Sequence, residues 1–253
     1  MQNPYQELDQ KIQQSFTDSR RNYGSPRIAQ DLARAGHEVS KSTVARRMKE
    51  LKIRAKRPRK YVYTTDSKHD MPIAPNVLDR DFSAQKPAQK WVSDITYFRI
   101  AKNWYYLSVV IDLADRAVLG WTISDNMTAQ HTTIQAFKKA IMNRKPTQGM
   151  IFHSDRGLQY ACQDFKTLLD KHQCVQSMSR RANCWDNAVA ESFFKTMKTE
   201  CIHKQEFYSP EHAYSIIFDY IDGWYNTVRI HSALDGKSPA QMFSCLTNET
   251  MAA

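Results

Sequence analysis

Three charged residues in one predicted helix have the types and the spacing to act on a phosphate group. The segment NAVAESFFKTMK, residues 187–198, places Glu191, Lys195 and Lys198 at positions i, i+4 and i+7. At about 100° per residue, these side chains share one side of a helix, and the apolar residues at 190, 193, 194 and 197 face away from them. A carboxylate between two lysines predicts a metal-binding acid whose neighbouring cations hold phosphates.

Two further acids lie in or at the end of apolar runs, where an ionised side chain needs a partner. Asp94 lies inside the apolar run of residues 91–100, and Asp155 ends the run of residues 149–155. An ionised acid within a strand is costly to bury unless it is paired or binds a metal. For any one of these acids alone, a cap, a turn or a salt bridge is the better explanation. If the two strands are neighbours and the helix covers them, however, both acids converge with Glu191.

Three converging carboxylates are a suitable site for Mg²⁺, which prefers oxygen ligands. Two such ions, about 3.5–4 Å apart, would clamp a phosphodiester for in-line displacement, and no nucleophilic side chain is needed. The pattern therefore predicts metal-dependent chemistry on a phosphodiester.

The order of the predicted elements indicates the fold that positions these acids. Two β-rich runs, residues 91–100 and 104–115, flank a tight turn, and RAVLGWTIS supplies a third strand. A helix, a strand, a second helix, a fifth strand and the helix of residues 187–198 follow. This order predicts an α/β fold, a mixed five-stranded sheet with helices on both faces.

A small, all-α unit precedes the predicted sheet. Apolar residues recur every four positions in residues 6–20, a second helix begins at Pro26 and stops at Gly36, and a third begins with Ser40 or Ser42 as its N-cap. This is the helix-turn-helix pattern, although a plain three-helix bundle fits the periodicity almost as well.

The positive charge of the chain is concentrated in the same region. The formal net charge is +10, and residues 1–70 contain 16 Lys and Arg against 8 Asp and Glu. Such a surplus predicts a polyanionic partner, although a solvated charged face would give the same count. DNA contacts are predicted for the outer side of the third helix and for the basic run after it, at Arg46, Arg47, Lys49, Arg54, Lys56 and Arg57.

Composition divides the chain into four predicted parts. Residues 1–55 form the helix-turn-helix DNA-binding domain, and residues 56–90, with four prolines and no periodicity, form a basic extended linker. Residues 91–205 form the catalytic core, and residues 206–253 form a C-terminal helical extension.

Several classes of protein are excluded by what the sequence lacks. No run of 18 apolar residues exists, and the N-terminus lacks the order of a signal peptide, so we expect a cytoplasmic protein with no membrane partner. The five cysteines form no CxxC pair, and no Gly-rich phosphate loop is present.

The acidic motifs resemble those of the second-frame (OrfB) transposases of a large bacterial insertion-sequence family with a retroviral-integrase-like DDE catalytic core. The runs WVSDITY, HSDRGLQY and DNAVAESFFKTMK match the three acidic motifs of that family, and 35 residues separate Asp155 from Glu191, as they do there. The C-terminal run YNTVRIHSALDGKSPAQMF also matches. The resemblance covers nearly the whole chain, including the helix-turn-helix region.

This resemblance implies an RNase H-like fold and a DDE polynucleotidyl transferase that cleaves and joins DNA strands at insertion-sequence ends. It implies two Mg²⁺ ions, for which Mn²⁺ can substitute, held by the catalytic triad of Asp94, Asp155 and Glu191. Lys198 is expected to contact DNA near the cleaved end. Further DNA contacts are predicted beside the acidic motifs and in the C-terminal motif, at Arg156, Gln159, Asn187, Lys195 and Arg229.

The expected partners are double-stranded DNA, at insertion-sequence ends and at the target, and further copies of the chain that bring two ends together. The product of an upstream reading frame, fused or separate, is another expected partner, and the expected location is the bacterial nucleoid. Two alternatives stay open. A non-joining RNase H-like nuclease would share the triad but would not need the basic N-terminal domain. A DNA-binding regulator with an inactive core would have no reason to keep all three acids.

Overall fold

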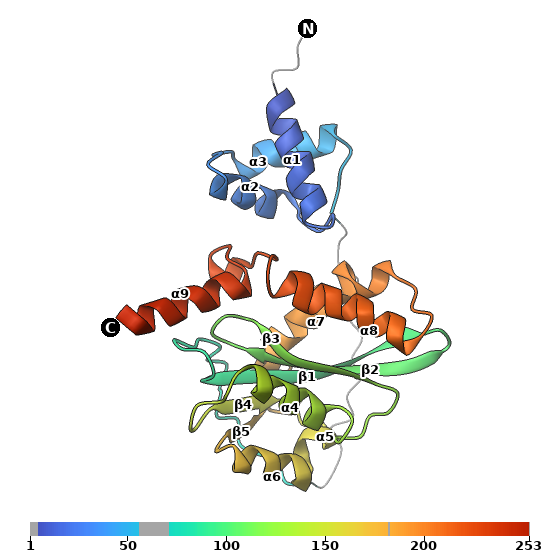
Figure 1. The fold of residues 1–253 in the computed structure, drawn as a ribbon, viewed down its shortest axis with the longest axis vertical. Helices are drawn as coiled ribbons and strands as arrows, with labels where there is room; N and C mark the ends of the chain where they lie inside the picture. Colours follow the sequence, from blue (N-terminus) through green and yellow to red (C-terminus); the bar gives the residue numbers. More distant parts are fainter. Residues whose placement is uncertain (1–4, 56–70, 182, 253) are drawn as a thin grey trace.

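A mixed five-stranded sheet forms the centre of the protein (Figure 1). The structure is a computed structural model that describes residues 5–55, 71–181 and 183–252. The strands lie in the order β3-β2-β1-β4-β5; β1, β2 and β3 are antiparallel, and β4 and β5 run parallel to β1. Their bounds are β1 Lys90–Ile100, β2 Asn103–Asp112, β3 Val118–Ser124, β4 Ile151–Ser154 and β5 Val175–Met178. The predicted α/β fold class is confirmed, and the strands of Asp94 and Asp155 are neighbours.

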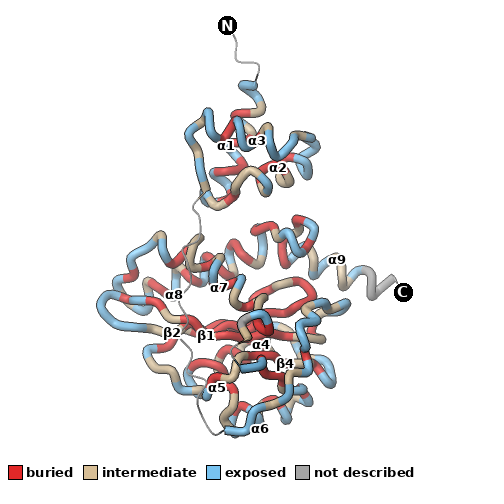
Figure 2. The backbone as a smooth tube through the Cα atoms, turned by 180° about the vertical axis from the view of Figure 1, so that it is seen from behind, coloured by how far each residue is buried: buried red, intermediate tan, exposed pale blue. Residues whose placement is uncertain are grey.

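Helices cover both faces of this sheet, and the residues between sheet and helices are buried (Figures 1 and 2). On one face, Phe137 of α4 and Phe165 of α6 pack edge to face against each other and against Phe152 of β4. The other face packs against α7, α8 and the π-helix η3. The helical elements of the core are α4 Thr133–Asn143, α5 Leu158–Ala161, α6 Gln163–Lys171, η1 Cys184–Asn187, α7 Ala188–Glu200, η2 Ile202–Lys204, α8 Pro210–Phe218, η3 Asp219–Tyr225, η4 Ser232–Leu234 and α9 Pro239–Ala252. Over the described ranges, no helix has both the length and the apolar composition of a membrane span.

Gly120 allows α4 to pack directly against β3. A Cβ atom at this position would lie 2.1 Å from the carbonyl oxygen of Ala136 and 2.6 Å from the backbone nitrogen of Ala140. Both atoms belong to the backbone of α4, so the helix itself would have to move to make room for a methyl group.

We expect Gly120→Ala to lower the free energy of unfolding by about 1–3 kcal/mol, because overpacking a filled contact forces a backbone shift. Urea denaturation followed by circular dichroism measures the change. Gly24→Ala is the matched control, since Gly24 has a φ of −88° and a Cβ there would meet Pro26 at an ordinary 3.8 Å. Its expected change is within about 1 kcal/mol. Equal losses in the two variants would contradict the crowding at Gly120.

The N-terminal domain contains the three predicted helices, α1 (Gln6–Asp18), α2 (Ser25–Arg34) and α3 (Lys41–Glu50). The hydroxyl of Ser40 accepts a hydrogen bond from the Thr43 nitrogen at 3.1 Å, so Ser40 is the N-cap of α3. Apolar side chains from all three helices are buried together in one cluster, Ile12, Phe16, Ile28, Leu32, Val44 and Met48. The same cluster continues into buried residues of the sheet and of α7, so the N-terminal domain and the core are packed together.

Contacts at several points join the N-terminal domain to the C-terminal part of the chain. Arg20 pairs with Asp219 at 2.6 Å, and the Ile230 nitrogen donates a hydrogen bond to the Tyr23 hydroxyl at 2.9 Å. Arg34 donates to the carbonyl oxygen of Gly236 at 2.6 Å. The region after α7 therefore packs against both the sheet and the N-terminal domain.

Candidate active site

Asp94 lies in the middle of β1, on the sheet face that α7 covers. Side chains alternate along a strand, so Asp94 shares its face with Val92 and Phe98, which belong to the apolar cluster below α7. Asp94 is only 9% exposed. Burial raises its pKa well above the ordinary value, and the charges of Asp155 and Glu191 raise the pKa further.

Asp155 directly follows β4 and lies beside the strand of Asp94. In the parallel pairing of β4 with β1, His153 is the partner of Val92, so the chain leaves β4 next to the centre of β1. The Asp155 Oδ1 atom accepts a hydrogen bond from the Gly157 nitrogen at 2.9 Å. This bond closes the turn after the strand and fixes the carboxylate at the end of the sheet.

Glu191 approaches the same place from the first turn of α7, where its side chain is half-buried. Burial raises the pKa of Glu191, and the charge of Asp155 raises it further. The charges of Asp155 and Glu191 also raise the pKa of Asp94, so each pair among the three acids interacts electrostatically. The structure thus brings together the three acids that the sequence singled out.

At Asp94, the effect of the two neighbouring acids outweighs that of the nearby cation. Lys198 lowers the pKa of Asp94, but this effect is smaller than those of burial and the neighbouring acids that raise it. Within residues 5–55, 71–181 and 183–252, no group of three Asp, Glu, His or Cys side chains has the spacing to hold a metal ion. Oxygen ligands and converging negative charges nevertheless fit a hard divalent cation. We expect the acids to move closer together when such an ion binds.

Removal of the Asp94 charge should stabilise the metal-free protein while it destroys the site. We expect Asp94→Asn to raise the free energy of unfolding by about 1–2 kcal/mol at neutral pH in EDTA. In the wild type, the pKa of Asp94 is higher in the folded than in the unfolded state. The protonated carboxyl therefore contributes stability below the unfolded pKa of about 4, and the wild type loses that stability as pH rises through the folded pKa. The gain in the variant should therefore grow between pH 4 and pH 7. Thermal unfolding across this range tests it, with the exposed Asp125→Asn as control; a pH-independent difference would contradict the argument.

Buried polar groups fix β1 below the acids. The Ser93 hydroxyl donates to the Val109 carbonyl at 2.7 Å and lies 2.8 Å from the Tyr160 hydroxyl. Asn187, predicted to contact DNA, is buried, and its Nδ2 atom donates to the Ser93 carbonyl oxygen at 3.1 Å. Asn187 thus ties the strand of Asp94 to the start of α7.

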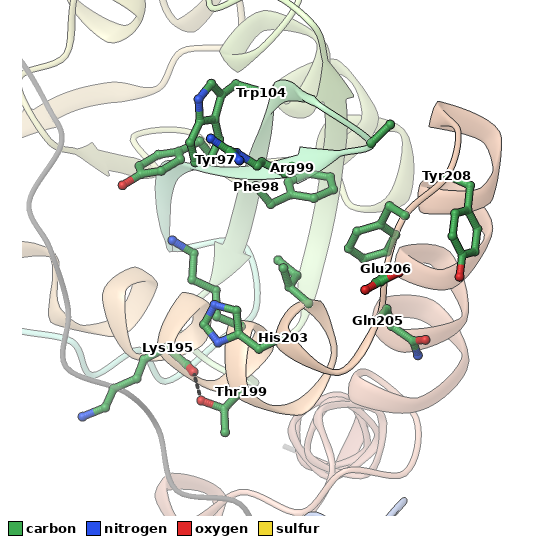
Figure 3. Close-up of a pocket in the computed structure, with 14 residues that line it drawn as sticks. Tyr97, Phe98, Arg99, Trp104, Lys195, Thr199, His203, Gln205, Glu206 and Tyr208 are labelled. Atoms are coloured by element: carbon green, nitrogen blue, oxygen red, sulfur yellow. Dashed lines mark hydrogen bonds between the residues drawn. The ribbon is translucent and has the colours of Figure 1, made fainter.

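A groove with a volume of about 650 Å³ lies between the β1–β2 hairpin and α7 and is lined by aromatic and basic side chains (Figure 3). Tyr97, Arg99 and Trp104 come from the β1–β2 hairpin, and the Arg99 guanidinium lies 4.6 Å from the Trp104 ring centre. Lys195 and Lys198 come from α7, with the Lys198 amine 5.0 Å from the Tyr97 ring centre. Aromatic faces combined with cations suit a nucleic-acid strand, so the DNA contacts of Lys195 and Lys198 stay a prediction for this groove.

The basic residues predicted on the outer side of the third helix are not all outside. Arg47 is 7% exposed, and its guanidinium pairs with Asp9 of α1 at 2.5 Å and with Glu50. Its predicted outward position is therefore wrong, because α1 supplies a buried acid opposite it. The exposed members of the set are Arg46, Lys49 and Arg54, whereas Lys56 and Arg57 lie outside the described residues.

Arg229 also lies away from the open surface. Its side chain is 3% exposed, and its Nε and Nη2 atoms each donate to Glu200 at 2.8 Å. Glu200 strongly raises the pKa of Arg229 and keeps the guanidinium charged. Arg229 therefore does not lie on the open surface, where its DNA contact was predicted, because Glu200 engages its guanidinium inside the protein.

Arg156 and Gln159, predicted to touch the strand being cut, hold the loops around Asp155. Arg156 donates through Nε to the Ser179 carbonyl oxygen at 2.6 Å, and Gln159 donates through Nε2 to the Met127 carbonyl oxygen at 2.9 Å. Both side chains are half-buried, so they border the site and also support it.

A buried ion-pair network before α7 was not predicted from the sequence. Asp186 is fully buried and accepts hydrogen bonds from Arg80 at 2.8 Å, from Asn76 at 3.1 Å and from the side chain and backbone of Arg180. Asn76 and Arg80 belong to the predicted linker and thus anchor it to the catalytic core. Arg80 is 106 residues from Asp186, and no local spacing in the sequence connects them.

Comparisons with known proteins agree with this architecture. An integrase core domain model matches residues 84–184, a second integrase core domain model matches residues 172–239, and an HTH-like domain model matches residues 4–61. The fold is similar to a chain of the simian T-cell lymphotropic virus intasome in complex with the PP2A regulatory subunit B56 gamma. The TM-score is 0.54 at 16% identity, over 92% of this chain and 73% of that one. At this identity, the similarity concerns the fold alone.

The sequence relatives are transposable-element proteins. The 31 kDa protein of insertion element IS600 from Shigella sonnei is 37% identical over 233 residues, which cover 92% of this chain and 85% of that protein. Transposase InsF for insertion sequence IS3A from Escherichia coli (strain K12) is 42% identical over 236 residues, 93% of this chain and 82% of the relative. The chain therefore belongs to the IS3-family InsF transposases, DNA-binding enzymes that combine an HTH-like domain with an integrase core.

Proposed function

We propose that this transposase cleaves DNA strands at insertion-sequence ends and joins them to target DNA, with Asp94, Asp155 and Glu191 holding two divalent ions. The observation that carries the proposal is the convergence of these acids from β1, from the end of β4 and from the first turn of α7. Mg²⁺ is the expected ion, and Mn²⁺ can substitute because it accepts the same oxygen ligands.

Bound ions would activate the attacking water or 3′-hydroxyl and stabilise the leaving oxygen. The chain itself supplies the ligands and their positions. Asn187 holds β1 against the start of α7, so the carboxylates of Asp94 and Glu191 keep their relative places. Lys198 lies close enough to Asp94 to lower its pKa, and there it would bind a phosphate next to the cleaved bond.

DNA binding would extend from the groove to the N-terminal domain. Lys195 and Lys198 line the groove, and Arg156 and Gln159 border Asp155. The exposed side chains Arg46, Lys49 and Arg54 would contact phosphates on the N-terminal domain, together with Lys56 and Arg57 of the basic run. We keep the division into a DNA-binding domain (1–55), a linker (56–90), a core (91–205) and a C-terminal extension (206–253) as part of this proposal.

The active form would be a multimer, because two ends must be held together for strand transfer. The similarity of this fold to a chain of a viral intasome supports the idea, although it concerns the fold only. The product of an upstream reading frame, fused or separate, would add recognition of the ends. Because its target would be chromosomal DNA, the protein would act at the nucleoid.

Strand cleavage and joining by the full chain test the proposal. The substrate is a labelled duplex with the inverted repeat that flanks the coding sequence, mixed with supercoiled target DNA in Mg²⁺, Mn²⁺ or EDTA. We expect joined product only with a divalent ion. Hydrolysis without any joined product would instead support the non-joining nuclease, and binding without either reaction would support the regulator; both results contradict the proposal.

A further inference from the structure

A cavity of about 240 Å³ lies between the N-terminal domain and the core, and its wall is rich in guanidinium groups. Arg27 comes from α2, Arg116 from the turn between β2 and β3, and Arg229 from the segment after η3. His231 also lines the cavity. The cavity is therefore built by both domains, separately from the acidic site.

Acids balance this cluster only in part. Glu200 binds Arg229 at 2.8 Å and lies 3.6 Å from Arg27, so one carboxylate serves two guanidinium groups. Asp112 and Asp115 act on Arg116 through space, but both are in ion pairs with Arg144, at 2.6 and 2.7 Å. Positive charge is thus in excess around the cavity.

His231 responds to this surplus. Burial, together with the charges of Arg229, Arg27 and Arg116, lowers the pKa of His231 to about 2, so the imidazole is neutral. The three arginines therefore act together on one point of the cavity wall.

Arg116 occupies a backbone position that favours other residues. Its φ is +61°, in the left-handed region that Gly, Asn and Asp adopt most readily. Its Nη2 atom donates to the Phe82 carbonyl oxygen at 3.0 Å, whereas its buried Nη1 atom has no hydrogen-bond partner among the residues that the structure describes. A buried guanidinium nitrogen without a partner, in a residue that lines a cavity with two further arginines, is a donor available to a ligand.

The cavity lies close to the catalytic acids. Ala188, Val189 and Ser192 in the first turns of α7 form part of its wall, and Ser192 is the neighbour of Glu191 on that helix. A helix with its side chains is about 10–12 Å across. Along one DNA strand, this distance spans about three nucleotides at 3.4 Å each.

We propose that this cavity binds a phosphodiester group of a DNA strand engaged at the acidic site, and that the bound phosphate locks the N-terminal domain onto the core. The inference rests on the proposed function for the identity of the ligand. A phosphate presents several oxygens to donors that converge from different directions, which matches guanidinium groups on two domains. The chain thereby gains a DNA contact that also fixes the placement of its DNA-binding domain.

Arg116→Asn is the informative variant, because Asn tolerates the left-handed backbone that Arg116 must adopt and the fold should be kept. We expect about tenfold weaker binding of a short cognate duplex to the full chain at low salt. The plot of log K for DNA binding against log salt concentration should become less steep, its slope losing about 0.9 in magnitude, the value for one lost phosphate contact. Arg21→Asn is the matched control, since Arg21 is exposed and has a φ of +62°. Its affinity and slope should equal those of the wild type, and so should the thermal stability of both variants.

Inorganic phosphate alone gives a readout that does not depend on transposition. At constant ionic strength, phosphate in place of chloride should raise the melting temperature of the wild type and of Arg21→Asn, but not that of Arg116→Asn. Unchanged DNA affinity and salt slope in Arg116→Asn would overturn the inference while strand joining by the wild type still stands. Stabilisation by phosphate in a wild-type protein that neither binds nor joins DNA would overturn the DNA ligand and the proposed function together.

Discussion

Glu191→Gln is expected to reduce strand joining by at least about 10³-fold, a loss comparable to removal of a principal electrostatic group from an active site. Gln keeps the volume of Glu and a single carbonyl oxygen, but it lacks the negative charge that a divalent ion requires. Glu191 and Asp155 both raise the pKa of Asp94, so the three carboxylates share one site, and loss of one proposed ligand should weaken ion binding there. A gel assay of joined product per unit time measures the effect.

DNA binding should survive this substitution. The affinity of Glu191→Gln for the cognate duplex should stay within a few-fold of the wild type, because the substitution leaves unchanged the lysines that we propose to bind phosphates, Lys195 and Lys198. Glu211→Gln is the matched control, since Glu211 is exposed in the first turn of α8, and it should join DNA at the wild-type rate. Mg²⁺-dependent joining at the wild-type rate by Glu191→Gln would remove Glu191 from the catalytic role.

The sheet and the convergence of the acids were predictable because both follow from local patterns. The period-two run around Asp94, the strand end at Asp155 and the helical period around Glu191 each fix one side chain relative to its own element. The order of the elements then makes β1 and β4 neighbours. Where periodicity decides the position of a residue, the sequence is sufficient.

Contacts between distant segments could not be predicted in this way. Arg47 was expected to lie outside because only the apolar residues were assigned to the inner stripe, yet it follows Val44 by three positions, on the buried side of α3. Asp9, 38 residues earlier, accepts its guanidinium inside the domain. Arg229 was predicted to contact DNA from the C-terminal motif alone, and it pairs with Glu200 inside the protein. The apolar stem of an arginine can be buried, but its guanidinium then needs a carboxylate partner. Whether a distant segment supplies that carboxylate depends on the tertiary fold.

The same limit applies to the linker. Residues 56–90 have no periodicity, so an extended segment was the natural interpretation. The structure describes its second half from residue 71, where Asn76 and Arg80 bind Asp186 in the loop that leads into α7. We expect these contacts to position η1, which carries Asp186 and Asn187, and with it the start of α7, where Glu191 lies; the stability of Asp186 variants tests this.

Asp186→Asn is expected to lower the free energy of unfolding by about 2–3 kcal/mol at pH 7, because a fully buried carboxylate loses its charge and several of its hydrogen bonds. The cost stays below that of an isolated buried charge, since the side chains of Arg80 and Arg180 are 45% and 48% exposed and can be rehydrated. The matched control is Asp79→Asn, where the acid is 75% exposed and pairs with Arg180 at 3.4 Å. Its expected change is within about 0.5 kcal/mol.

The dependence on pH separates loss of charge from loss of packing. The Arg180 side chain first, and Arg80 with it, hold the pKa of Asp186 well below its usual range. A depressed pKa contributes stability above the unfolded value of about 4, and this contribution is lost as pH falls through the folded value. The difference between wild type and Asp186→Asn should therefore be full at pH 7 and shrink below pH 4, in urea denaturation at each pH. A difference that is constant with pH would mean that the charge is not what anchors the linker to the loop before α7.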